Sequence, residues 1–91
     1  MKKRVHVFYS GTVHGVGFRA TAEEVASQLG VVGWVKNLRD GRVELLAEAE
    51  ESTLQEFLEA IRTSVMRNFI RQVEISWGDA LNSFDDFSIQ Y

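Results

Sequence analysis

Apolar and polar residues alternate along several short segments of the sequence, and two longer segments between them carry apolar residues at helical spacing. Alternation predicts half-buried strands, and spacing of three to four residues predicts amphipathic helices. The strands are predicted over residues 3–10, 31–38, 42–49, 71–78 and 85–91. The helices are predicted over residues 21–30 and from Ser52 to Val65. Few folds accommodate this order of elements.

The order strand, helix, strand, strand, helix, strand is that of the ferredoxin-like split βαβ (βαββαβ) fold, of class α+β. We expect an antiparallel sheet with two helices on one face, plus a short C-terminal strand. Capping boxes at Thr21 with Glu24 and Ser52 with Gln55 are predicted to open the helices, and Gly30 to end the first. Asp40-Gly41 predicts a two-residue hairpin turn. The apolar stripes from Leu54 to Val65 and from Val73 to Trp77 are expected to be core.

Composition limits the function classes. A chain of 91 residues is expected to form one domain, residues 1–91, and no apolar run is long enough to cross a membrane. Cysteine is absent, which fits a cytoplasmic protein without thiolate chemistry. A net charge of −3 argues against a general nucleic-acid surface, although it leaves room for a local anion site. His6 and His14 lie on different elements, so we expect no metal site.

The glycine-rich stretch GTVHGVGFRA, residues 11–20, joins the first predicted strand to the first predicted helix. GVGFRA matches a dinucleotide fingerprint, but the next strand runs into a hairpin and the chain is too short for two nucleotide-binding halves. Glycines that only shape a corner are a second interpretation. We favour a third, in which successive backbone N–H groups form an anion-binding nest at the positive end of the helix. Arg19 would then donate two parallel hydrogen bonds to a phosphate.

GTVHGVGFR, followed by GWVKNLRDGRVEL at residues 33–45, resembles the two signature segments of the acylphosphatase family. The resemblance extends over nearly the whole chain, to the closing FDDFSIQY. It implies a ferredoxin-like fold and hydrolysis of acyl phosphates to a carboxylate and inorganic phosphate, without a metal or cofactor. It also implies that Arg19 binds the phosphate and that Asn37 holds the attacking water. By the same resemblance, the phosphate-binding loop comprises Val13, His14, Gly15, Val16, Gly17, Phe18 and Arg19.

Three departures from the family pattern stand out. His14 occupies a position where the family usually has glutamine, Ala49 replaces a frequent glycine, and VMRNFIRQ replaces a Gly-Pro-type loop after the second helix. A loop histidine titrates near neutrality, so His14 is a rival candidate for a general base. We favour a packing role, because glutamine could not serve as a base. Lys36 and Arg39 are candidates for attracting anions, or are simply solvated.

Three rival functions stay open. An RNA-binding sheet would share this topology, but residues 42–49 carry no aromatic residue. A module of a larger carbamoyl-transfer enzyme would resemble this chain, but such modules tend to read FRP where this chain has FRA at residues 18–20. A regulatory domain would bind anions without turnover. The favoured interpretation is a small monomeric enzyme, with an acyl phosphate as substrate and phosphate or sulfate as competitor. The α-carboxylate of Tyr91 is expected to hold Arg19 if the last strand ends beside the loop.

Overall fold

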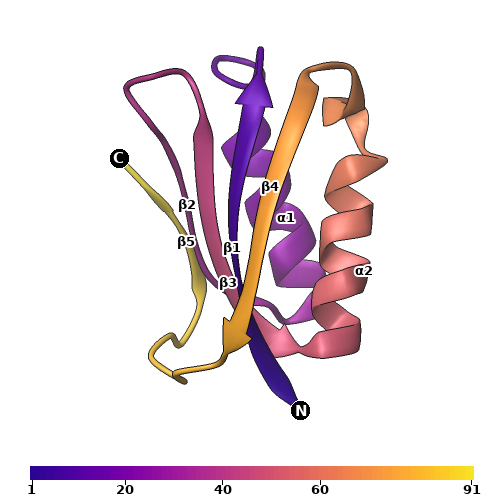
Figure 1. Ribbon diagram of the computed structural model, residues 1–91, viewed down its shortest axis with the longest axis vertical. Coiled ribbons are helices and arrows are strands. Elements are labelled where there is room, and N and C mark those ends of the chain that lie inside the picture. The colour runs from indigo at the N-terminus through magenta and orange to yellow at the C-terminus, as the bar shows by residue number, and fades with distance from the viewer.

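The structure is a computed structural model that describes all residues, 1–91. Two helices lie on the same side of one five-stranded sheet (Figure 1). The elements in chain order are β1 (Lys2–Gly11), α1 (Phe18–Leu29), β2 (Val32–Asn37), β3 (Val43–Glu50), α2 (Glu51–Arg62), the 3-10 helix η1 (Val65–Asn68), β4 (Ile70–Asp79) and β5 (Phe87–Gln90). Neither α-helix has the length and apolar run needed to cross a bilayer.

The strand order is β4-β1-β3-β2-β5. The first four strands pair antiparallel, whereas β5 lies parallel to β2, so the sheet is mixed. The predicted α+β ferredoxin-like arrangement is confirmed, and the fifth strand is the predicted C-terminal one. The core lies between the sheet and the helices, and its largest fully buried side chains are Phe18, Phe57, Leu45, Leu54 and Ile61.

Both predicted capping boxes are wrong. Helix α1 begins at Phe18, with Gly17 as its N-cap, because the glycine loop runs directly into the helix. Helix α2 begins at Glu51 immediately after β3, which pairs with β1 as far as Glu50 and leaves no loop for a capping serine. The predicted end of the first helix before Gly30 is confirmed.

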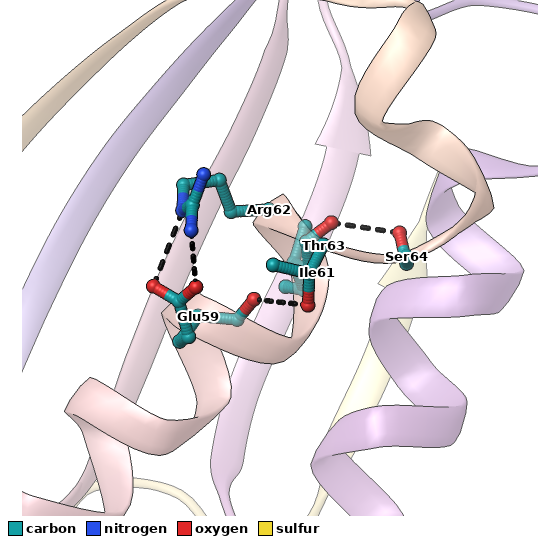
Figure 2. Close-up of polar contacts among 5 residues, drawn as sticks. All are labelled: Glu59, Ile61, Arg62, Thr63 and Ser64. Carbon is teal, nitrogen blue, oxygen red and sulfur yellow. Dashed lines mark hydrogen bonds and ion pairs between the residues drawn. The ribbon is translucent and has the colours of Figure 1, made fainter.

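The second helix is shorter than its apolar stripe predicts. It ends at Arg62, where the Thr63 hydroxyl donates to the Glu59 carbonyl at 2.9 Å (Figure 2). The Ser64 hydroxyl donates to a carbonyl of the last turn at 2.7 Å (Figure 2). It also accepts an N–H of η1. These local hydrogen bonds compete with the backbone hydrogen bonds that would extend the helix. Val65 therefore lies outside the helix and is 75% exposed, contrary to its prediction as core.

The β2–β3 hairpin has a three-residue loop rather than the predicted two-residue turn. The Gly41 N–H donates to the Leu38 carbonyl at 3.2 Å, and the Leu38 N–H donates to the Arg42 carbonyl at 2.8 Å. Gly41 has a φ of 95°, as expected for the bulge residue after such a turn. The loop is held by Asp40, whose carboxylate accepts the Arg42 backbone N–H at 3.0 Å and Nε at 2.8 Å. These two hydrogen bonds hold the pKa of Asp40 below its usual range.

Three strand ends meet at one end of the sheet. β1 and β2 both run antiparallel to β3, so their C-terminal ends point the same way. The register is specific: Tyr9 and Asn37 both lie opposite Val43, one on each side of β3. β5 runs parallel to β2 and pairs with it as far as Lys36, which brings Tyr91 to the same end. The glycine loop, the end of β2 and the C-terminus are therefore neighbours.

A buried carboxylate holds the segment that carries the chain from β4 to β5. Glu48 of β3 is only 2% exposed. It accepts the Leu81 N–H at 2.9 Å, the Asn82 N–H at 3.0 Å and Arg4 Nε at 2.8 Å. Burial alone would raise the pKa of Glu48, but these hydrogen bonds outweigh burial and hold the pKa below its usual range. This clamp ties residues 80–86 to the sheet.

We predict that Glu48→Gln lowers the free energy of unfolding by about 2 kcal/mol at neutral pH, because a buried, charge-assisted set of hydrogen bonds is broken. The folded-state pKa of Glu48 is depressed, so its contribution is complete above the ordinary carboxyl pKa and is lost as the pH falls through the folded-state value. The difference in the free energy of unfolding between wild type and variant should therefore become smaller in acid. Urea unfolding at a series of pH values measures it, with Glu56→Gln on the exposed face of α2 as control. A gap independent of pH would contradict the clamp.

Candidate active site

A cavity of about 220 Å³ lies where the three strand ends meet. Arg19 is the only charged side chain that lines it. The cavity brings together the two residues predicted to be catalytic, Arg19 and Asn37, although they lie on different elements. Its lining comprises Val13, Gly15, Gly17, Phe18, Arg19, Ala20, Asn37, Ile89 and Tyr91.

The backbone of the glycine loop alternates in handedness. Gly15 and Gly17 have φ values of 72° and 82°, whereas Val16 and Phe18 between and after them do not have positive φ. Successive residues of opposite hand form the concave arrangement of N–H groups that binds anions. A side chain at either glycine would meet no neighbouring atom, so glycine is required there by conformation and not by space.

The N–H groups of this loop are free to bind a ligand. Residues 13–17 belong to no helix or strand, and none of their N–H groups donates a hydrogen bond within the protein. The loop is nevertheless anchored at both ends, because Val13 and Phe18 are buried. The Phe18 ring packs on the Tyr9 ring of β1, with centroids 4.7 Å apart. A row of unpartnered donors, anchored at both ends, thus adjoins the N-terminus of α1.

Arg19 lies in the first turn of α1 and is half-buried. Its guanidinium stacks over the ring of Tyr91, 5.0 Å from the ring centroid. The sequence led us to expect the α-carboxylate of Tyr91 as the partner, but no ion pair joins them. The aromatic ring makes the contact instead, and stacking leaves the edge of the guanidinium, with its N–H donors, available. The alternation of Phe87, Ile89 and Tyr91 was the sequence signal for this face of β5.

Asn37 is the last residue of β2 and shares its side of the strand with Val35, which is fully buried. Its side chain therefore faces the helix side of the sheet, where it lines the cavity with Arg19. An amide there can accept a hydrogen bond from water and donate another. Its neighbour Lys36 points to the other face, where it stacks on Trp34 and lies 3.8 Å from Glu44.

Two predicted loop residues, His14 and Val16, do not line the cavity. His14 is exposed, and its Nε2 donates to the Arg42 carbonyl at 2.8 Å. This bond ties the glycine loop to the hairpin that carries Asn37. A glutamine amide at this position could donate the same bond. Arg39, at the tip of the hairpin, is exposed and makes no ion pair.

On the face of the sheet opposite the helices, polar and charged side chains contact one another. Arg4 lies 2.8 Å from Glu48, and His6 lies 2.6 Å from Glu44. Arg42 stacks over Phe8, 4.7 Å from its ring centroid. RNA-binding sheets of this topology present free aromatic rings and cations on this face. In this protein the groups named above are paired with one another instead.

Comparison with known proteins identifies the family of the chain. The family model described as Acylphosphatase matches residues 5–89. An acylphosphatase of Syntrophobacter fumaroxidans is 40% identical over 90 residues, which cover 99% of this chain and 93% of that protein. The crystal structure of acylphosphatase from Bacillus subtilis is similar with a TM-score of 0.91 at 36% identity, covering 98% of this chain and 99% of that one. HypF from T. kodakarensis matches with a TM-score of 0.83 at 26% identity, over 98% of this chain but 12% of that one. The chain therefore belongs to the acylphosphatase family of hydrolases.

Proposed function

We propose that the cavity binds the phosphoryl group of an acyl phosphate through the loop and Arg19, while Asn37 aligns the water that attacks it. The observation that carries the proposal is the convergence of three groups on one cavity: unpartnered loop N–H groups, a guanidinium and a side-chain amide. The products are a carboxylate and inorganic phosphate.

Hydrolysis of an acyl phosphate needs few catalytic groups. The leaving group is a carboxylate with a pKa of about 4, so no general acid has to protonate it. Phosphoryl transfer passes through a loose transition state, and catalysis consists mainly of positioning and charge stabilisation. A site without a strong base or acid in its lining is sufficient for this reaction.

The loop and Arg19 divide the phosphate oxygens between them. The alternating backbone from Gly15 to Phe18 presents N–H donors, and the positive end of α1 adds its dipole. Arg19 supplies the full charge and two parallel donors. Because the ring of Tyr91 stacks on the guanidinium, fewer orientations of Arg19 are accessible and less freedom is lost on binding.

Asn37 acts on the water rather than on the phosphate. Its amide oxygen accepts a hydrogen bond from the water, and its amide nitrogen can donate to water or substrate. Holding the water in line with the breaking bond is a contribution of proximity and orientation. A phosphate oxygen of the substrate receives the proton as the water attacks.

The remaining expectations are consistent with this assignment. Inorganic phosphate and sulfate would compete for the loop. The domain, residues 1–91, would act as a monomeric enzyme in the cytoplasm. It would need no metal or cofactor and bind no nucleic acid. Anion binding without turnover is the alternative that an assay must exclude.

The decisive assay measures phosphate released from a simple aromatic acyl phosphate, with and without a chelator. We expect turnover in both conditions. Arg19→Gln should lower kcat/KM by about 10³-fold or more and weaken inhibition by inorganic phosphate, because the fixed positive charge is lost. Arg39→Gln, an exposed arginine near the same end of the sheet, is the matched control and should change little. Phosphate binding by wild type without any release would establish the non-catalytic alternative.

Asn37→Ala should lower kcat by about 10²-fold or more while the inhibition constant of inorganic phosphate stays nearly unchanged. The reason is that the variant loses water alignment but keeps the loop and Arg19. Steady-state kinetics with phosphate as inhibitor measures both quantities. Asn68→Ala, in the exposed part of η1, controls for loss of an asparagine. A variant that loses mainly phosphate affinity would show that Asn37 binds substrate instead.

His14→Gln should keep nearly all activity, because glutamine can donate the bond to the Arg42 carbonyl. His14→Ala should lose more, since the loop is no longer tied to the hairpin. The pH profile of kcat/KM for wild type and His14→Gln separates this tether from general-base catalysis. Loss of a neutral inflection together with a fall of orders of magnitude in His14→Gln would make the histidine the base.

A further inference from the structure

Strand β4 has an apolar face that no helix covers. Val73, Ile75 and Trp77 lie opposite buried residues of β1 and were predicted to be core, but they are 37%, 44% and 45% exposed. The reason is that α2 packs on β1 and β3 rather than on β4 (Figure 1). A groove of about 260 Å³ therefore stays open between α2 and β4.

The groove is mostly apolar and follows two turns of α2. Its helix side consists of Gln55, Leu58, Glu59 and Arg62, which helical spacing places on one face. At about 1.5 Å per residue, this face is about 10 Å long. The lining on the sheet side comprises Tyr9 of β1 and Ile70, Val73 and Ile75 of β4.

The hydroxyl of Tyr9 is a polar group of the groove without a partner. Tyr9 is only 2% exposed, and its hydroxyl makes no hydrogen bond. No fully buried side-chain oxygen or nitrogen lacks a partner, so the small exposed part of Tyr9 includes the hydroxyl oxygen. Because Tyr9 lines the groove, this oxygen opens into it. Burial raises the pKa of Tyr9 above its usual range, so the hydroxyl stays protonated and can donate.

The two charged groups in the lining neutralise each other. Arg62 Nε donates to the Glu59 carboxylate at 3.2 Å, and the guanidinium makes a second contact with the same carboxylate (Figure 2). Gln55, the other polar residue of the helix side, is uncharged. An ionic ligand would lose hydration in the groove without gaining a free counter-charge. The lining therefore favours a neutral molecule.

We propose that this groove binds a small neutral molecule that has an apolar chain and one hydrogen-bond acceptor, with the Tyr9 hydroxyl as donor. Sites for small molecules combine a mainly apolar lining with a few polar groups that fix orientation. A ligand here satisfies the hydroxyl and covers Val73 and Ile75. The groove and the catalytic cavity share no residue, so this site is additional to the one proposed for hydrolysis.

The position of Tyr9 sets the direction of the ligand. Val73 lies opposite Tyr9, and Ile75 lies two residues nearer the end of the sheet at which α2 begins (Figure 1). The acceptor therefore lies towards the end of α2 that carries Arg62, and the chain runs along Ile75 towards Gln55. An unbranched ketone whose oxygen is near one end of the chain, such as methyl hexyl ketone, has this shape.

An NMR titration of the isotope-labelled protein with methyl hexyl ketone tests the proposal. We expect amide shifts in residues 55–62 and 70–75 and a dissociation constant of about 1 mM or lower, which a ligand of this size can reach. Saturating inorganic phosphate should leave the constant unchanged. Absence of shifts up to the solubility limit of the ketone, or competition by phosphate, would overturn the proposal.

Two variants test the lining. Tyr9→Phe keeps the ring that packs on Phe18 but loses the donor, and should raise the dissociation constant about fivefold. Val73→Lys places an ammonium group at the groove from an exposed position and should raise the constant at least about tenfold. Val65→Lys, an exposed apolar position outside the groove, is the matched control and should leave it unchanged. Binding to Tyr9→Phe as tight as to the wild type would show that the hydroxyl is not the donor.

A charged ligand tests the class of molecule. Octanoate has as many carbon atoms as methyl hexyl ketone but carries a full negative charge. It should bind at least about fivefold more weakly, because Glu59 already occupies the guanidinium of Arg62. Binding of octanoate as tight as that of the ketone would overturn the assignment of a neutral ligand.

Discussion

The site depends on a constraint of strand direction. Two strands that flank a third and run antiparallel to it must end on the same side of the sheet. Here β3 is the shared partner, and Tyr9 and Asn37 both lie opposite Val43. The loop that follows β1 and the amide that ends β2 are thus neighbours, although β1 and β2 do not pair with each other. Because β5 runs parallel to β2, the C-terminal residue joins them.

The groups needed to hydrolyse an acyl phosphate are those that strand ends and a helix N-terminus can supply. Strand ends and a helix N-terminus offer backbone donors, a partial positive charge and a few side chains, but few titratable groups. Phosphate binding needs donors and charge, and a carboxylate leaves without being protonated. The contacts around the cavity mostly limit motion: Phe18 on Tyr9, Tyr91 on Arg19 and the His14 bond to the hairpin.

The far end of the sheet supports the same site. Glu48 holds the segment after β4, and this segment returns the chain across the sheet to form β5. The alternating pattern of β3 places this buried carboxylate on the face opposite the helices. By holding the segment before β5, the carboxylate helps to bring Ile89 and Tyr91 to the cavity. The long crossing also leaves β4 as an edge, since β5 adds to the opposite side of the sheet.

Local pattern was enough for the order of elements and for the core faces of β1 and β3, because burial on one face imposes period two. The clustered glycines also indicated the loop, in which Gly15 and Gly17 have positive φ. The motifs also indicated Arg19 and Asn37. Pattern failed where a residue's surroundings come from distant segments. Val73, Ile75 and Trp77 alternate like core residues, yet no helix covers them. His14 and Val16 belong to the loop but lie outside the cavity, whereas Ile89 and Tyr91 line it.

The sequence by itself determined which faces are apolar and where the chain turns, since these follow from residue type and spacing. Only the tertiary structure decided which apolar face is covered and which loop residues meet, because both depend on where α2 and β5 pack.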